Sequence, residues 1–438
     1  MIKKFLLVVV GLIIVGIAGF AAYAYHRPIA PITASDRPSF SPESVERGRI
    51  IAAAGYCATC HTEKGGAPYA GNYPVVTNFG TIYATNLTPD PETGIGSWSP
   101  DAFRRAMQQG VAMDGSHLFP AFPYDHFTKM TNQDVDDVYA YLMTEVAPVR
   151  QATKETTIPF PMNLRFLQAG WKLLYVDFGR FQPDSAHSDG WNRGAYLVEG
   201  VTHCGACHTP RNRLGAEEKS KPFAGASIDG WYAPPLTAAN ASAVPWNAEA
   251  FSYFLKSGAG LYHGVAAGPM APVVHAGVAQ LPDSDLSAIG EYLGDVVGAP
   301  ESDPATNPVV VASLKANEPT RSYRGDTGQR LYATACASCH YNAKQILPDR
   351  PDLGINSSVR QADPSNLLQV ILTGITTKEG SGGIVMPGFG PVYSDDDIAA
   401  VANYLRTRLA GLEPWPDLPA KVGAVRAQIS EPSQIAQK

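Results

Sequence analysis

Three short motifs in the chain place two cysteines three positions apart and follow the second one directly with a histidine. They are Cys57-Ala58-Thr59-Cys60-His61, Cys204-Gly205-Ala206-Cys207-His208 and Cys336-Ala337-Ser338-Cys339-His340. Two thiols on one helical turn can each add to a vinyl group of a haem, and the next imidazole can then ligate its iron. The pattern therefore predicts haem c at each motif, with His61, His208 and His340 as proximal ligands.

Redox dithiols, zinc ribbons and structural disulfides, the other sites that paired cysteines form, agree less well with this spacing. A redox dithiol has no reason to recur three times with histidine at the same offset. Zinc ribbons pair their cysteine motifs about 15 to 20 residues apart, whereas these motifs lie more than a hundred residues apart. All six cysteines of the chain belong to the motifs, so none is left for a structural disulfide. The sequence predicts three covalently bound haem c groups.

Each motif requires a helix that leads the chain into its first cysteine. The segment from Glu43 to Gly55 is the first of these helices. A glycine stands eight to ten residues before each motif, at Gly48, Gly194 and Gly328. Glycine inside a helix costs up to about 1 kcal/mol, so its recurrence indicates that another element packs closely there. The expected partners are the closing helices, which end in Tyr141-Leu142, Tyr292-Leu293 and Tyr404-Leu405.

A second repeated pattern lies in the middle of each unit. The segment from Trp98 to Phe103 matches the segment from Trp246 to Phe251 without gaps. Ser99 and Asn247 are predicted to cap the helices that follow. A glycine is predicted to end each of these helices, and the three glycines are Gly110, Gly258 and Gly374.

The residue twelve positions after each of these glycines is Phe122, Met270 or Met386. A methionine in a loop ahead of the closing helix can present its thioether to the open face of a haem, so Met270 and Met386 are predicted sixth ligands. Phenylalanine cannot ligate iron. The first haem therefore lacks a ligand at this position.

Three residues near Phe122 are substitutes for the missing ligand. Met130, next to the predicted helix cap Thr131, is favoured, although it can equally be a core residue. His126 and Met113 are alternatives, as is a vacant site. The remaining histidines considered are interpreted as structural: His117, His187, His203, His263 and His275. Tyr83 to Thr88 is expected to form a loop along the first haem.

The N-terminus predicts a membrane segment. Lys3 and Lys4 precede an uncharged apolar run of 21 residues, Phe5 to Tyr25, which spans about 31 Å as a helix, close to the ~30 Å hydrocarbon core. An uncleaved anchor is favoured over a cleaved signal, for which Ala22-Tyr23-Ala24 resembles a cleavage site. Both alternatives place the remainder on the periplasmic face of a bacterial inner membrane.

The length and net charge of the chain indicate its number of domains and the partners that it does not bind. A chain of 438 residues with net charge −6 suggests roughly three domains and has no basic excess for binding nucleic acid. We expect a mainly α protein with three tandem cytochrome c-like domains, at 40–150, 185–300 and 320–412. They lie between an anchor or signal segment, 1–27, and a loose polar tail, 413–438. The long linker from Pro148 to Asp189 is expected to be a strap over the haem domains or a docking surface for another subunit.

Several longer stretches resemble a known family. They are TNLTPDPETGIGSWS, FPAFPYDHFTKM, WNRGAYLVEGVTHCGACHTPRN and GPMAPVV. The chain is similar, from about residue 40 to 410, to the tri-haem cytochrome c subunits of bacterial membrane-bound periplasmic dehydrogenases. Their catalytic partners are quinoproteins, flavoproteins or molybdopterin enzymes. The resemblance implies electron transfer from a dehydrogenase catalytic subunit through three haems to ubiquinone or a terminal oxidase, without substrate chemistry in this chain.

The resemblance also favours one branch of that family. In the alcohol dehydrogenase branch the first unit usually carries methionine where this chain has Phe122, so the departure favours a molybdopterin partner. Two alternative functions remain open at this stage. One is an exported haem peroxidase that uses an open first haem, and the other is a stand-alone electron shuttle.

Overall fold

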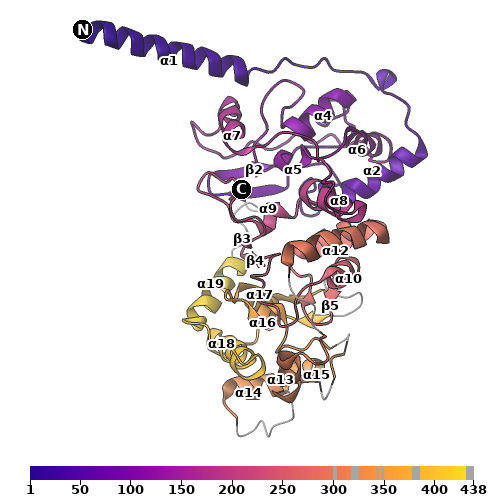
Figure 1. Ribbon diagram of the computed structural model, residues 1–438, viewed down its shortest axis with the longest axis vertical. Helices are drawn as coiled ribbons and strands as arrows, with labels where there is room; N and C mark the ends of the chain where they lie inside the picture. The colour runs from indigo at the N-terminus through magenta and orange to yellow at the C-terminus, as the bar shows by residue number, and fades with distance from the viewer. Residues whose placement is uncertain (299–302, 317–324, 343–344, 348–349, 377–384, 431–438) are drawn as a thin grey trace. The chain divides into compact units, whose positions relative to one another are not determined.

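The computed structural model describes residues 1–298, 303–316, 325–342, 345–347, 350–376 and 385–430 (Figure 1). The chain is mainly α-helical, as predicted, and its named strands form two-stranded antiparallel pairs. It divides into two compact units. Unit 1 comprises Met1–Gln182, Glu199–His203 and Asn212–Ala216, and unit 2 comprises Pro183–Val198, Cys204–Arg211 and Glu217–Lys438. Most of the predicted second domain and all of the third therefore belong to unit 2.

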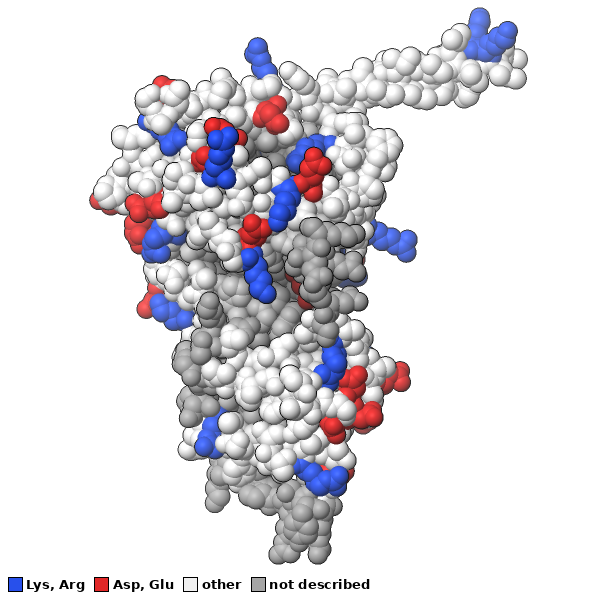
Figure 2. All heavy atoms as spheres, turned by 180° about the vertical axis from the view of Figure 1, so that it is seen from behind, with Lys and Arg blue, Asp and Glu red and all other residues white. Residues whose placement is uncertain are grey.

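Unit 1 begins with the apolar helix α1, Ile2–Ala24. Its 23 residues are long and apolar enough to cross a membrane. In the face shown in Figure 2 this helix carries charged side chains only at its free end, where the sequence has Lys3 and Lys4. On the rest of that face basic and acidic side chains are interspersed, which agrees with the absence of a basic excess in the sequence.

The first cysteine motif, Cys57 to His61, follows the opening helix of unit 1. The elements are the 3₁₀ turn η1 Ala34–Asp36, α2 Pro42–Ala54, α3 Cys57–Cys60, β1 Pro74–Thr77, β2 Gly80–Tyr83, α4 Pro100–Gln109, α5 Tyr124–Phe127 and α6 Asn132–Thr144. The Oγ of Ser99 accepts a hydrogen bond from the amide of Ala102 at 3.2 Å, as predicted for a helix cap. The linker then adds the 3₁₀ turn η2 Arg165–Leu167 and the helix α7 Gln168–Tyr175.

The second predicted domain repeats this order. Its elements are α8 Asp189–Tyr196, the π-helix η3 Leu197–Val201, α9 Gly205–His208, β3 Ala226–Ile228, β4 Trp231–Ala233, α10 Ala248–Ser257, β5 Ala259–Gly260, β6 Gly264–Val265, α11 Met270–Pro272, η4 Val273–Gly277, η5 Val278–Gln280 and α12 Asp283–Val297. The side chain of Asn247 caps α10 by accepting from the amide of Ala250 at 2.8 Å.

The third predicted domain keeps the opening, middle and closing helices, but among its described residues α16 stands where the other two domains have their first strand pair. Its elements are α14 Thr327–Leu331, η7 Tyr332–Cys336, α15 Ala337–His340, α16 Ser357–Arg360, α17 Ser365–Thr373, β7 Gly374–Ile375, β8 Met386–Pro387, α18 Asp395–Tyr404 and η8 Leu405–Leu409. The helix α13 Pro308–Ala316 precedes the predicted bounds, and α19 Leu418–Ser430 follows them. The glycines that end α4, α10 and α17 all have positive φ, at 62°, 77° and 78°, which explains why glycine recurs there.

The three recurrent glycines of the opening helices lie where a closing helix crosses, as predicted. A Cβ on Gly48 would lie 1.8 Å from the carbonyl oxygen of Asp137 in α6. The corresponding distance is 2.0 Å from Gly194 to Ala288 in α12, and 2.3 Å from Gly328 to Ala400 in α18. At each crossing the Cβ of a closing-helix tyrosine would also lie only 2.9 to 3.0 Å away, and the three are Tyr141, Tyr292 and Tyr404. Only glycine lets the two backbones approach this closely.

The C-terminal segment differs from the loose tail expected. Residues 418–430 form the helix α19, and Trp415, Leu418, Val422 and Val425 are buried in the core of the third domain. Leu418, Val422 and Val425 follow one another at spacings of four and three residues, which puts them on one helical face. The stripe is short, so the sequence alone did not predict it. Residues 431–438 of the expected tail lie outside the described residues.

Candidate haem-attachment sites

The three cysteine motifs form single helical turns. His61 donates its backbone N–H to the carbonyl of Cys57 at 2.9 Å, and His208 donates to Cys204 at 3.0 Å. The first site is α3, and the other two are α9 and α15, each of which begins one residue after the first cysteine of its motif. Each turn therefore places two thiols and the following histidine close together. All six cysteines are free thiols.

A backbone carbonyl orients the histidine at every motif. The Nδ1 of His61 lies 2.6 Å from the carbonyl oxygen of Thr85, that of His208 lies 2.7 Å from Pro234, and that of His340 lies 3.0 Å from Pro351. A carbonyl only accepts, so Nδ1 carries the proton in all three rings. Nε2 is then the nitrogen with the lone pair, which is the tautomer that an imidazole needs to ligate a metal ion.

Burial sets the protonation state of these groups. Desolvation lowers the pKa of His61, His208 and His340, and the hydrogen bond to the carbonyl only partly opposes this effect. The rings are therefore neutral at pH 7. Burial also raises the pKa of Cys57 to about 12 and of Cys207 and Cys336 to about 11, so these sulfurs are protonated thiols.

This donor set fits covalent haem c. Free paired thiols on one turn supply two attachment points, and a neutral, oriented imidazole supplies one axial ligand. The same arrangement occurs three times with the same orienting contact. A haem held there would contribute reversible one-electron transfer, whereas the chain's own groups attach it and fix the ligand geometry.

Met270 and Met386 lie in corresponding places of unit 2. Met270 opens α11, after the short strand pair β5–β6 that follows Gly258. Met386 lies in β8 and is paired with Ile375 of β7, directly after Gly374. Both methionines are only partly buried. Residues 377–384, between the strands of the second pair, lie outside the described residues.

The corresponding place in unit 1 is occupied by aromatic side chains. The ring of Phe122 lies 5.4 Å from the ring of Phe127, centroid to centroid. Met130 is 1% exposed, and its carbonyl accepts a hydrogen bond from the Gln108 side chain at 3.2 Å. Met130 is thus a deeply buried residue ahead of α6.

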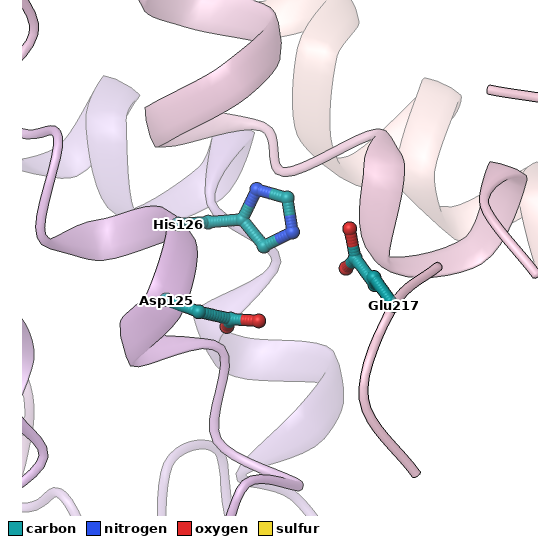
Figure 3. A group of neighbouring side chains, drawn as sticks. All are labelled: Asp125, His126 and Glu217. Carbon is teal, nitrogen blue, oxygen red and sulfur yellow. The ribbon is translucent and has the colours of Figure 1, made fainter. Parts of the chain in front are cut away.

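His126 and Met113 have other surroundings. His126 projects from α5 beside Asp125 (Figure 3), and its Nδ1 lies 2.8 Å from the carbonyl oxygen of Glu199 within unit 1. Met113 is partly buried, and its carbonyl accepts a hydrogen bond from the amide of Ile29 at 2.9 Å. The sixth ligand of the first haem therefore stays a prediction.

Two of the histidines interpreted as structural are buried and hydrogen-bonded to backbone. The Nε2 of His117 donates to the carbonyl of Ala24 at 2.9 Å, and the Nε2 of His263 lies 3.0 Å from the carbonyl of Val244. Burial lowers the pKa of both rings to about 4, so both are neutral. His263 also stacks on Trp246, with 3.8 Å between ring centroids.

Sequence profiles of two families match the segments around the first and the third cysteine motif. The family described as cytochrome c matches residues 45–145. The family described as cytochrome c oxidase, cbb3-type, subunit III matches residues 324–405. The matched ranges contain the first and the third cysteine motif.

Full-length relatives extend the likeness over most of the chain. It is 43% identical to a nicotinate dehydrogenase subunit of Pseudomonas putida, over 93% of this chain and 34% of that protein. It is 38% identical to the fructose dehydrogenase cytochrome subunit of Gluconobacter japonicus, over 86% of this chain and 81% of that protein. The gluconate 2-dehydrogenase cytochrome c subunit of Pantoea cypripedii is 37% identical, over 83% and 85%. The chain belongs to this family of dehydrogenase cytochrome c subunits.

Membership confirms the predicted resemblance and decides the class of function. The cytochrome corresponds to the electron-transfer subunits of such complexes and not to their catalytic subunits, and its cytochrome c domains indicate covalently bound haem c. It spans about a third of the length of the nicotinate dehydrogenase relative and more than four-fifths of the fructose and gluconate dehydrogenase subunits.

The orienting carbonyls are the site residues that the sequence analysis missed. A signal for them exists in the sequences of the first two predicted domains. Tyr83-Ala84-Thr85-Asn86-Leu87-Thr88 matches Tyr232-Ala233-Pro234-Pro235-Leu236-Thr237 in four of six positions, and Thr85 and Pro234 are the two carbonyl residues. In the third predicted domain a leucine, Leu353, again lies two residues after the carbonyl residue Pro351. The expected loop along the first haem thus supplies the contact to His61.

Proposed function

We propose that this cytochrome carries three haem c groups and passes electrons from a periplasmic dehydrogenase catalytic subunit to ubiquinone or a terminal oxidase. The observation that carries the proposal is the threefold recurrence of one local geometry, in which paired thiols precede an imidazole whose Nδ1 is held by a backbone carbonyl. A protein that used only one or two haems would have no reason to keep the third motif in this form.

The proposed attachment residues are the six cysteines, and the proposed proximal ligands are His61, His208 and His340. Met270 and Met386 are the proposed sixth ligands of the second and third haems, because each follows its helix-ending glycine at the same distance in sequence and lies beside a short strand pair. Met130 is proposed for the first haem, with His126 or a vacant site as the alternatives. The proposed haem domains are 40–150, 185–300 and 320–412.

The partner is proposed from the relatives. Identity is 43% with a subunit of nicotinate dehydrogenase and 38%, 37% and 33% with the cytochrome subunits of fructose, gluconate and alcohol dehydrogenases. Together with Phe122, this order supports a catalytic subunit of the molybdopterin type. The proposed location of the complex is the periplasmic face of the inner membrane, where α1 would hold it as an uncleaved anchor.

The haem count and the electron-transfer role can be tested on the full chain after export and haem attachment. The pyridine haemochrome spectrum is expected to give three haems per chain, and replacement of Cys336 and Cys339 by alanine is expected to leave two. In the complex with its catalytic subunit, substrate should reduce the haems, and added ubiquinone should reoxidise them. Haems that stay oxidised when substrate is supplied, or one haem that binds cyanide and turns over peroxide, would contradict the proposal.

A further inference from the structure

A large apolar surface lies on the linker of unit 1. Seven apolar side chains between residues 160 and 178 are exposed, with exposed fractions from 37% at Leu167 to 77% at Phe160. They are Phe160, Met162, Phe166, Leu167, Leu173, Leu174 and Phe178. We call these seven residues the linker apolar surface. A soluble protein rarely leaves so many large apolar residues exposed within one short segment.

The helix α7 within this segment is anchored by its polar side. Lys172 is buried, and its Nζ donates to the carbonyls of Gln109 and Gly110 at 2.7 and 2.6 Å. The third partner of Nζ is the Nδ1 of His117 at 3.0 Å. This Nδ1 is an acceptor, because the Nε2 of the same ring donates to Ala24. The lysine therefore points into the protein.

The opposite side of the same helix points its leucines outward. Leu173 and Leu174 are 66% and 69% exposed. This is the reverse of an ordinary surface helix, which buries leucine and exposes lysine. The buried hydrogen bonds of Lys172 hold α7 in this orientation, so the exposure of the leucines is built into the fold.

The other basic residue of the segment, Arg165, is exposed, but its guanidinium also contacts unit 1. The guanidinium of Arg165 donates to the carbonyl of His117 at 3.1 Å and lies 4.8 Å from the ring centroid of Phe119. Since Arg165 and Lys172 both bind groups of unit 1, they are not directed at anionic headgroups. Asn163, Arg165 and Asp177 of the segment are exposed as well. Most of the large side chains that it exposes are nevertheless apolar, so a ligand is recognised mainly through apolar contact.

The helix α7 lies beside the C-terminal end of the apolar helix α1 (Figure 1). The rings of Phe20 and Phe166 meet edge to face, with 6.4 Å between centroids. A Cβ on Gly170 would lie 3.5 Å from the ring of Phe20. Phe20 lies four residues before the end of α1, which is about 6 Å along a helix axis. Helices that lie in a membrane interface insert their apolar face about 5–10 Å.

Two tyrosines at the end of α1 lie close to Phe20 along the helix axis. Tyr23 and Tyr25, at the end of the helix, are exposed, and tyrosine is enriched at the boundary between membrane and water. The contact of α7 with Phe20 therefore puts the linker apolar surface at the depth where α1 would leave the hydrocarbon.

We propose that the linker apolar surface is a second membrane contact, which inserts α7 and its flanks into the lipid interface beside α1. The occupant is the acyl region of the bilayer and not a protein. This inference rests on the proposed role of α1 as a membrane anchor. It means that the first haem domain is seated directly on the membrane surface, and that the anchor does not hold it as a flexible tether.

The test uses the full chain with its haems attached, whose native cysteines are then consumed as thioethers. Leu174 is replaced by a single cysteine, which is labelled with an environment-sensitive nitrobenzoxadiazole fluorophore. The labelled protein is then placed in phospholipid nanodiscs with or without doxyl-labelled lipids. Energy transfer to haem affects both samples equally. We expect L174C to lose emission in the doxyl discs, and equally so in neutral and anionic lipid.

Two matched positions control the measurement. Val76 in β1 is also an exposed apolar residue of unit 1, at 56%, and V76C is expected to show no quenching. L12C in α1 reports the anchor itself. Absence of quenching at L174C overturns the proposal, including the case in which its emission shifts only when the catalytic subunit is added. Quenching at L174C without quenching at L12C overturns the anchor and leaves the second contact standing.

Discussion

The side chain of Asn366 binds the backbone of Tyr232 with both of its polar atoms. Its Oδ1 accepts from the Tyr232 amide and its Nδ2 donates to the Tyr232 carbonyl, each at 2.8 Å. Asn366 belongs to α17 of the third predicted domain, and Tyr232 to β4 of the second. Pro234, two residues further on, supplies the carbonyl that orients His208. A residue of the third predicted domain thus fixes the strand that leads to the carbonyl holding His208 of the second.

Replacing Asn366 by alanine is expected to destabilise unit 2 and to alter the second haem site. The change leaves two partly buried backbone groups of Tyr232 without their side-chain partner, which costs up to about 1–3 kcal/mol. Chemical denaturation followed by circular dichroism measures the free energy of unfolding, and a redox titration reports the second haem. Ser365→Ala, one residue away, is the control and should stay within about 0.5 kcal/mol. Equal free energies of unfolding and equal haem potentials in the two variants would show that the contact between Asn366 and Tyr232 does not stabilise the strand.

Gly194→Ala should force α8 and α12 apart. Its Cβ would lie 2.0 Å from the carbonyl oxygen of Ala288, a backbone atom that cannot rotate away. Overpacking of this kind costs about 1–3 kcal/mol or more, so thermal unfolding should occur at a lower temperature. Gly170→Ala in α7 is the control, because its Cβ would make ordinary contact at 3.5 Å. It should be neutral or more stable by up to about 1 kcal/mol.

Lys172→Met should lower the stability of unit 1 in a pH-dependent way. The carbonyls of Gln109 and Gly110 lose their donor, which costs about 1–3 kcal/mol. Burial lowers the pKa of Lys172 to about 7, whereas an unfolded lysine has a pKa of about 10.4. Between these values the unfolded chain binds a proton that the folded chain has released, so the wild type gains stability as the pH rises.

The methionine variant has no such titration. The difference in free energy of unfolding between wild type and K172M should therefore grow from about pH 7 to about pH 10, as measured by thermal unfolding in detergent at pH 6, 8 and 10. A difference that is constant over this range would mean that the three acceptors keep the ammonium charged in the folded state.

The sixth ligands can be tested through the haem potentials. A methionine ligand raises the potential, so Met270→Leu and Met386→Leu should each lower one of three midpoints in a spectroelectrochemical titration. The shift should lie within the roughly 0.8 V range that axial ligands cover. If Met130 is not a ligand, the first haem should already titrate below the other two, and Met130→Leu should leave all three midpoints unchanged.

Phe122→Met completes this test by restoring a methionine at the position that matches Met270. If the distal side of the first haem is open there, this change should raise the lowest midpoint. Three equal, high midpoints in the wild type would be evidence against an unusual first haem.

Trp415→Ala should destabilise the third domain. Trp415 is buried, donates from Nε1 to the carbonyl of Gln361 at 3.1 Å, and packs under the Arg406 guanidinium. Removing such a side chain costs about 3–5 kcal/mol. Trp415→Phe keeps most of the apolar volume and should cost less. If the alanine variant unfolds like the wild type, α19 does not contribute to this core.

Repetition in the sequence predicted the features that depend on local geometry. The positions of Gly48, Gly194 and Gly328 predicted helix crossings, because only a close backbone contact explains a glycine inside each helix. Ser99 and Asn247 predicted helix starts for a similar reason, since capping involves residues a few positions apart. These predictions needed no knowledge of what lies across the core.

The features that the sequence did not predict depend on residues far apart in the chain. The helix α19 was missed because its apolar stripe is short and faces a core formed by other elements. The outward leucines of α7 make sense only once Lys172 is seen to be satisfied by Gln109, Gly110 and His117.

The cysteine motifs alone identified the chemistry of this cytochrome, because covalent attachment and axial ligation require fixed residue types at fixed spacing. The sequence did not show that the carbonyls of Thr85, Pro234 and Pro351 orient the three motif histidines, or that Asn366 holds the strand beside one of them. In each contact one partner is a backbone amide or carbonyl, which every residue carries, so residue identity records the contact only weakly. The tertiary structure decided them by bringing distant segments within hydrogen-bonding distance.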